Sequence, residues 1–187
     1  MLLKNRLFVS LNLPENVIQQ IIKLRDNICT DEKIKWEPRE KYHLTIKFIG
    51  DVSNEMVEEI SDELIFVTQY PEIKCSFNKF GFFYRDEKPA ILWAGLKVDD
   101  LLLKLIMELN EKLNKYSISM DNRKFNPHIT LLRIKNDSGN NFVNNFKNFT
   151  FDPILFTTNS ITLFKSILHP EGSKYFEIKN YKLKELE

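Results

Sequence analysis

The chain has 187 residues, of which 43% are hydrophobic and 28% are charged. A chain of this length can bury a sizeable core, and its composition is that of a folded globular protein. The 27 Lys and Arg residues nearly balance the 26 Asp and Glu residues, which leaves a net charge of +1. This balance excludes a strong overall attraction to nucleic acid or to an anionic membrane, so any RNA contact must rest on a local patch.

The apolar runs and the glycine and proline content exclude further classes of protein. The N-terminal segment "LFVSLNLP" (7–14) is too short and too polar to be the apolar region of a signal peptide. No apolar run approaches the roughly 18 residues of a membrane span, so we expect a cytoplasmic protein with no membrane partner. Five glycines and seven prolines argue against disorder and against a Gly-rich phosphate loop.

Hydrophobic periodicity predicts an alternation of strands and helices along the chain. In the first half it predicts strands at 6–14, 33–38 and 42–50, helices at 15–29 and from Ser53 to Val67, and a hairpin of 73–85 and 90–96. In the second half it predicts a helix from Asp99 or Asp100 to Lys115, a strand at 125–135, a polar connection with a short helix around Phe142–Phe146, and two closing strands at 154–168 and 174–183. No low-complexity linker divides the chain, so residues 1–187 are predicted to form one α+β domain with two lobes.

Two strands carry the same short motif, His-x-Thr, at His43/Thr45 and at His128/Thr130. The motifs lie 85 residues apart, nearly half the chain, as a duplication would place them. Because alternate residues of a strand share a face, each His and its Thr should lie together on a polar face whose reverse side is buried. We expect each lobe to offer one such strand to a shared cleft.

Two imidazoles and two hydroxyls suit the opening of a cyclic phosphodiester. The reaction needs a base for the attacking water and an acid for the leaving ribose oxygen, and imidazole has the one unperturbed pKa near neutrality. The hydroxyls of Thr45 and Thr130 can donate to the phosphoryl oxygens, where charge develops. A zinc site is a weaker alternative, since each motif supplies one ligand and the sequence shows no third or fourth ligand nearby. We therefore expect no metal and no cofactor.

The segments "WEPREKYHLTIKFIGDV" (36–52) and "FNPHITLLRI" (125–134) resemble the two signature motifs of the 2H phosphoesterase superfamily. They are most similar to its bacterial and archaeal RNA 2′,3′-cyclic phosphodiesterases, long named 2′-5′ RNA ligases. The resemblance extends to "RLFVSLNLP" (6–14) and to "LFKSILHPEGSKYFEI" (163–178). It implies a bilobal, pseudo-duplicated α+β fold in which two antiparallel sheets flank a central cleft, with helices on the outside.

The resemblance also implies an activity, namely metal-independent hydrolysis of a 2′,3′-cyclic phosphate on an RNA end or nucleotide to a 2′-phosphate. Members of the family can also join or cleave 2′-5′ linked RNA, in a reversible reaction. By motif, His43 would donate a proton to the leaving 3′ oxygen and His128 would accept one from water. Interacting imidazoles titrate jointly, so which of the two is the acid stays open. A monomer without an obligate protein partner is expected, because one chain supplies both motifs.

Other residues are candidates for holding the substrate. Arg133 resembles the arginine that follows the second motif and would suit a phosphate, although simple alternation places it on the face opposite His128. Phe8 and Trp36, the latter on a neighbouring predicted strand, could stack on a base, or could pack in the core or at its rim. Lys47 shares the alternation of His43 and could add charge at the mouth of the cleft, or could simply be solvated.

Two rival functions remain open at this stage. One is a related 2H enzyme that acts on a cyclic phosphate of ADP-ribose or on 2′-5′ oligoadenylate. The other is a binding module that recognises nucleotides or RNA ends without turnover, which is disfavoured because both His-x-Thr motifs are intact.

Overall fold

Two four-stranded antiparallel sheets dominate the computed structural model, which describes residues 4–121, 123–135 and 139–185. The first sheet has the order β2 (His43–Val52), β1 (Asn5–Asn12), β7 (Ser160–Ile167), β8 (Lys174–Lys182). The second sheet has the order β5 (His128–Arg133), β4 (Lys88–Val98), β3 (Ile73–Arg85), β6 (Ile154–Thr158). Both His-x-Thr strands, β2 and β5, are therefore edge strands of their sheets.

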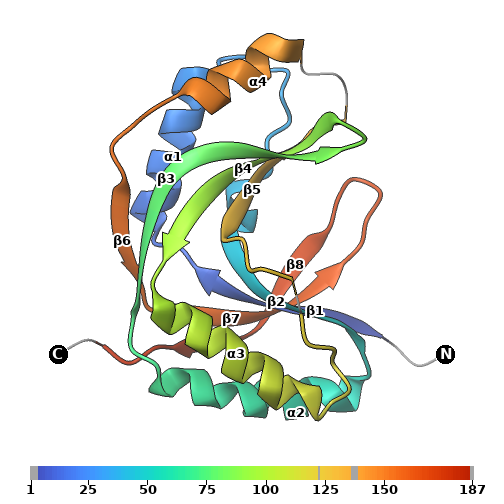
Figure 1. Cartoon of the computed structure of the whole chain (residues 1–187). Coiled ribbons are helices and arrows are strands. Elements are labelled where there is room, and N and C mark those ends of the chain that lie inside the picture. Colours follow the sequence, from blue (N-terminus) through green and yellow to red (C-terminus); the bar gives the residue numbers. More distant parts are fainter. Residues whose placement is uncertain (1–3, 122, 136–138, 186–187) are drawn as a thin grey trace.

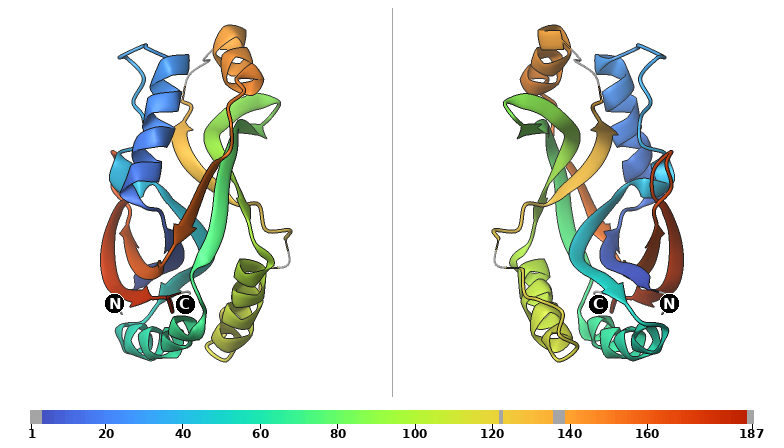
Figure 2. Two further views of the ribbon diagram at one scale, coloured as in Figure 1. Left: turned by 90° about the vertical axis from the view of Figure 1, so that its left-hand side faces the viewer. Right: turned by 90° about the vertical axis from the view of Figure 1, so that its right-hand side faces the viewer.

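Helices occupy the two ends of the molecule (Figures 1 and 2). At one end lie α1 (Glu15–Ile28) and α4 (Gly139–Asn148), and at the other end lie α2 (Asn54–Glu63) and α3 (Asp100–Asn114). Two 3₁₀ turns, η1 (Arg39–Lys41) and η2 (Leu64–Gln69), complete the described elements. No described helix is both long and apolar enough to cross a membrane.

The expected α+β architecture with two antiparallel sheets is confirmed. The lobes do not correspond to the two halves of the chain, however. β7 and β8 come from the second half and complete the sheet of β1 and β2, whereas β3 and β4 precede β5 and complete its sheet. Each sheet thus combines strands from both halves, because the chain passes to the second sheet between β2 and β3 and returns to the first at Asn159, between β6 and β7.

Two of the predicted strands are wrong. The segment 33–38 forms no strand, because within the described chain its only backbone bond to a strand is from the Glu37 N–H to the Leu131 carbonyl, at 2.9 Å. The expected strand 154–168 is two strands: β6 pairs with β3 and β7 pairs with β1. The first residues of the predicted polar connection, 136–138, lie outside the described part of the chain.

Alternation along β1 explains how the sheet separates core from site. Leu7, Val9 and Leu11 are at most 1% exposed and face the core. Phe8 and Ser10 point to the opposite face, which also carries the first His-x-Thr motif, because Ser10 pairs with Thr45 across the strands. The predicted helix after Asp99 is confirmed as α3, with the Asp99 carboxylate accepting from the Leu102 N–H at 3.1 Å.

Candidate active site

The two candidate catalytic histidines begin two adjacent strands. His43 is the first residue of β2 and His128 the first residue of β5, and these two edge strands contact each other. The backbone bond from Glu37 to Leu131 joins the segment before β2 to the middle of β5. The structure therefore brings both motifs to the line where the two sheets meet (Figure 1).

Each His-x-Thr strand has a β-bulge directly after its Thr. In β2, Thr45 pairs with Ser10 and Lys47 with Val9, which leaves Ile46 as the extra residue. The bulge reverses the alternation, so Lys47 follows Val9 toward the core and is only 4% exposed. The expectation that Lys47 points into the cleft with His43 is wrong for this reason.

The same reversal occurs in β5. Thr130 pairs with Trp93 and Leu132 with Leu92, which leaves Leu131 as the extra residue. Arg133 consequently returns to the face of Thr130, and its charge lowers the pKa of His128. Simple alternation predicts the opposite face, so the bulge is what brings Arg133 to the site.

Phe48 is the residue of β2 that corresponds to Arg133, five positions after its histidine. It pairs with Phe8 beyond the bulge and therefore lies on the His43 face, where its side chain is 70% exposed. Phe48 is not predicted as a site residue from the sequence, because simple alternation assigns it to the core face.

Three aromatic rings lie close to His43. Phe8 and Phe164 stack near its imidazole at centroid distances of 5.2 and 5.9 Å, and Tyr175 meets it edge-on at 5.5 Å. Burial among these rings lowers the pKa of His43 to about 4, because the charged form loses hydration. Phe8 is only 3% exposed, so its ring packs beneath His43 and is closed to a base, contrary to the stacking role expected for it.

His128 has one fixed ring nitrogen. Its Nδ1 lies 2.8 Å from the backbone carbonyl oxygen of Asn126. This oxygen can only accept a hydrogen bond, so Nδ1 carries the proton. Phe83 meets the ring edge-on at 4.8 Å, and Trp93 lies 6.5 Å away. Burial lowers the pKa of His128, the Asn126 bond opposes this, and the charge of Arg133 adds to the lowering.

The indole of Trp93 occupies space that is open because Gly81 and Gly95 carry no side chain. A Cβ on Gly81 would come within 2.3 Å of the indole, and a Cβ on Gly95 within 2.7 Å. The ring can therefore lie close to the backbones of β3 and β4, on the face that carries Thr130. The glycines inside these two strands were the available sequence signal for this close approach.

Two predicted substrate residues, Trp36 and Arg133, lie in different surroundings. Trp36 packs under the Arg25 guanidinium at 4.5 Å and against Phe142 and Phe146, which are on α4. Its place in this packing contradicts a base-stacking role. Arg133 is 59% exposed, and its Nε lies 3.3 Å from a Glu37 carboxylate oxygen, so its guanidinium can turn toward a phosphate at a small cost.

A pocket of about 330 Å³ adjoins His43. It is lined by Asn12, Leu13, Glu15, Ile18, Arg39, Glu40, Tyr42, His43 and Phe164. Among the described residues, no group of three or more His, Cys, Asp and Glu side chains is placed to hold a metal ion.

The low pKa of His43 predicts a loss of stability in mild acid. The unfolded chain, with a histidine pKa near 6.5, binds a proton that the folded chain rejects until about pH 4. Stability is therefore fully present above pH 6.5 and falls between pH 6.5 and 4, by up to about 3 kcal/mol. Urea unfolding at pH 7.5 and 4.5 should show a smaller loss in His43→Gln than in the wild type. Equal losses in the two proteins would contradict the burial of this imidazole.

Comparisons with known proteins show the family of the chain. The family model described as "LigT like Phosphoesterase" matches residues 11–93 and 96–175. Curated relatives named RNA 2′,3′-cyclic phosphodiesterase include the Thermotoga maritima protein, which is 29% identical over 91% of both chains. The Methanocaldococcus jannaschii protein is 28% identical over 94% of this chain and 99% of its own. The Escherichia coli protein is 30% identical over 68% of this chain and 71% of its own.

Solved structures share the fold. A crystal structure of a Thermus thermophilus protein has a TM-score of 0.76 at 22% identity, covering 95% of this chain and 97% of its own. E. coli LigT complexed with 3′-AMP has a TM-score of 0.74 at 24% identity, covering 97% of this chain and 99% of its own. With a family model that spans most of the sequence and a fold shared along nearly its whole length, the chain belongs to the LigT-like phosphoesterase family, within the 2H phosphoesterase superfamily.

Proposed function

We propose that this protein is an RNA 2′,3′-cyclic phosphodiesterase that opens the cyclic phosphate at an RNA end to a 2′-phosphate without a metal. The observation that carries the proposal is the placement of two His-x-Thr motifs on adjoining edge strands, each followed by the same bulge. The relatives of known name in bacteria and archaea support the same substrate class.

His128 is the proposed general base. With the proton on Nδ1 held by the Asn126 carbonyl, its Nε2 is the free acceptor that can take a proton from the attacking water. Its lowered pKa keeps the ring neutral, and so able to accept, at neutral pH.

His43 is the proposed general acid. As water attacks phosphorus and the P–O3′ bond breaks, protonated His43 gives its proton to O3′, and the product is a 2′-phosphomonoester with a free 3′-hydroxyl. Solvent then removes the proton from His128 and restores the one on His43. The bound phosphate anion raises the pKa of His43 from about 4, so substrate binding itself promotes the acid form.

Three further side chains are proposed to hold the phosphate, and one to hold the base. Thr45 and Thr130 lie on the same strand faces as the two histidines, and Arg133 returns to the His128 face after its bulge. Their donors can stabilise charge on the phosphoryl oxygens. Phe48, an exposed aromatic ring on the His43 face, replaces Phe8 and Trp36 as the candidate for base stacking.

The acid and base roles predict two displaced pH profiles. Because the pKa values of both histidines are lowered in the free protein, the bell of kcat/KM should be centred below pH 6.5. The bound phosphate raises these pKa values, so the bell of kcat should lie at higher pH than that of kcat/KM. The measurement is a steady-state series with a 2′,3′-cyclic mononucleotide from pH 4.5 to 8.5. A flat profile, or two coincident bells, would contradict the assignment.

Removal of the Arg133 guanidinium should weaken transition-state binding. We expect Arg133→Gln to lower kcat/KM by about 10- to 100-fold, since a charge-assisted bond to a phosphate contributes about 1.5–3 kcal/mol. Lys135→Gln, which removes the same charge from an exposed position two residues further on, is the matched control. An equal, small loss of activity in the two variants would contradict a phosphate-binding role for Arg133.

A substrate panel tests the specificity. The purified protein is incubated with an RNA bearing a 2′,3′-cyclic end, a cyclic phosphate of ADP-ribose and 2′-5′ oligoadenylate. We expect the RNA to have the highest kcat/KM, with a minor joining reaction in which the 5′-hydroxyl of a second RNA replaces water, O3′ leaves, and a 2′-5′ linkage forms. Faster turnover of either other compound would assign the protein to a sibling activity, and binding of RNA ends without any turnover would make it a binding module.

The cellular setting is also proposed. The described helices include none that could cross a membrane, and we infer a cytoplasmic enzyme that acts as a monomer of one domain, 1–187, without an obligate protein partner. One chain supplies both histidines, which makes a second copy unnecessary for the chemistry. Light scattering at micromolar concentration should give the 22.2 kDa of a single chain.

A further inference from the structure

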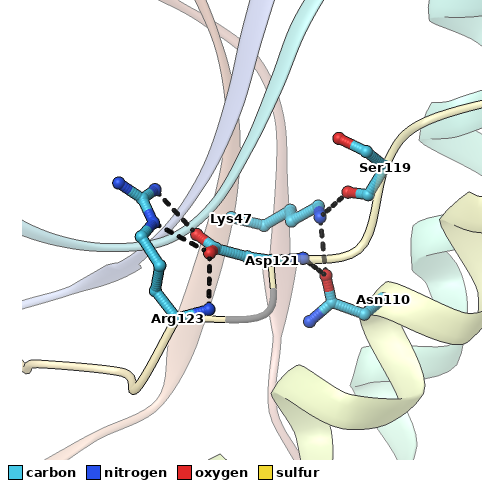
Figure 3. Close-up of polar contacts among 5 residues, drawn as sticks. All are labelled: Lys47, Asn110, Ser119, Asp121 and Arg123. Atoms are coloured by element: carbon cyan, nitrogen blue, oxygen red, sulfur yellow. Dashed lines mark hydrogen bonds and ion pairs between the residues drawn. The ribbon is translucent and has the colours of Figure 1, made fainter.

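A buried lysine lies directly behind the first His-x-Thr motif. The bulge at Ile46 turns Lys47 away from the site and into the interior, where it is 4% exposed. Its Nζ donates to the Asn110 side-chain oxygen at 2.6 Å and to the Ser119 carbonyl at 2.7 Å (Figure 3). A charged group so placed carries a cost of desolvation, which its partners must offset.

The partners of Lys47 belong to the part of the chain that leads to the second motif. Asn110 lies on α3, and its side-chain amide nitrogen donates to the Ile106 carbonyl at 2.8 Å, which fixes its orientation. Ser119 lies in the connection between α3 and β5 that ends at His128.

The connection is organised further around the same amide. The Asp121 N–H approaches the Asn110 oxygen at 3.4 Å. The Asp121 carboxylate accepts from the backbone and from the guanidinium of Arg123, each at 3.1 Å, and it also favours the charged form of Lys47 (Figure 3). At its far end, the Pro127 carbonyl accepts from the Leu96 N–H at 3.0 Å, and Asn126 holds the imidazole of His128. The connection is thus anchored at both ends.

We propose that Lys47 is a positioning residue that ties the strand of His43, through Asn110 and Ser119, to the connection that places His128. The lysine sits two residues after Thr45 on one strand and bonds the opposite component of the site, so it fixes the relative position of the acid and the base. Catalysis by two side chains from different sheets depends on that relative position, since a misplacement of about 1 Å can cost about 100-fold in rate.

The test replaces Lys47 by Met, which keeps most of the apolar stem and removes the donors. Because the inference rests on the proposed function for its kinetic readout, two readouts are combined. We expect kcat for the RNA cyclic end to fall about tenfold with KM changed less than about twofold. Hydrogen exchange of the described residues in 117–127 should accelerate, and the NMR titration of the His128 ring should shift.

Two further variants separate positioning from stability. Ile60→Val, on the buried face of α2, lowers stability without touching the link and should leave kcat unchanged. Asn110→Ala removes one acceptor and should reproduce the Lys47→Met result; it also stands in for Lys47→Met if that variant does not fold. In Lys47→Met/Asn110→Ala, the loss of kcat should be no larger than in the more affected single variant.

The outcomes are distinct. An unchanged kcat in Lys47→Met or Asn110→Ala, or a lower kcat with unaltered exchange of the connection, overturns the positioning role. If the wild type does not open cyclic phosphates, the proposed function fails instead, and exchange of 117–127 together with the His128 titration still decides whether Lys47 holds the connection.

Discussion

His128→Ala and His43→Ala are each expected to lower kcat for opening of the cyclic phosphate by about 10²- to 10⁴-fold. The structure gives the reason for each: His128 presents a free Nε2 with its other nitrogen held by Asn126, and His43 stands over Phe8 and Phe164 at the start of the adjoining strand. KM should change much less than kcat, because proton transfer stabilises the transition state more than the bound substrate.

The control for these variants is His169→Ala, which removes the exposed third histidine and should leave kcat unaltered. Folding is expected to survive in both catalytic variants, because each imidazole is uncharged in the folded protein at neutral pH, so its removal leaves no buried charge unpaired. Circular dichroism melting checks this. Most of the activity persisting in either His43→Ala or His128→Ala would refute its role.

Gly81→Ala is expected to lower the free energy of unfolding by about 3 kcal/mol, although alanine is ordinarily the better strand residue. The added methyl would lie 2.3 and 2.4 Å from two atoms of the Trp93 six-membered ring, and Gly81 pairs directly with Trp93 between β3 and β4. The indole must shift, and because its neighbours are Phe83 and His128, activity should fall along with stability.

A second change separates the clash from any general effect of the substitution. In Trp93→Leu the ring is absent, so adding Gly81→Ala should cost far less than it does in the wild type. Urea unfolding of the four proteins forms a double-mutant cycle. A cost of Gly81→Ala that is the same with and without Trp93 would contradict the close approach.

Much of the fold can be predicted from the sequence. The spacing of Leu102, Leu105 and Leu109 predicts the buried face of α3, and the structure confirms that all three are fully buried. The alternation in β1 correctly separates the core face from the polar face. The strand predicted around Trp36 is wrong, because hydrophobic pattern cannot show that this segment, as far as the chain is described, has no strand partner beyond one bond to Leu131.

The site is harder to predict from the sequence than the fold, because its geometry depends on the two β-bulges. Alternation from His43 and His128 assigns Lys47 to the cleft and Phe48 and Arg133 to the opposite faces, and the bulges reverse all three positions. The consecutive Leu131 and Leu132 were a sequence signal for one bulge, since a regular half-buried strand does not bury two neighbours. In β2 no such pair stands out, because the buried neighbour of Ile46 is a lysine.

Burial explains the remaining differences between the predicted and the observed site. Phe8 follows the alternation as expected, yet it is covered by His43, Phe164 and Tyr175, two of which come from the C-terminal strands. Contacts between strands more than 150 residues apart in the sequence cannot be derived from local pattern. The low pKa of His43 arises from this same aromatic surrounding, so it too becomes predictable only once the two ends of the chain are placed in one sheet.

Metal-independent catalysis by two histidines can be tested in a single reaction. The purified protein is treated with excess EDTA and incubated with an RNA that bears a 2′,3′-cyclic phosphate, and the product end is identified by its mass and by its phosphate position. We expect complete conversion to the 2′-phosphate at the same rate as without EDTA. No conversion, conversion that returns only when a divalent metal is added, or a 3′-phosphate product would contradict it.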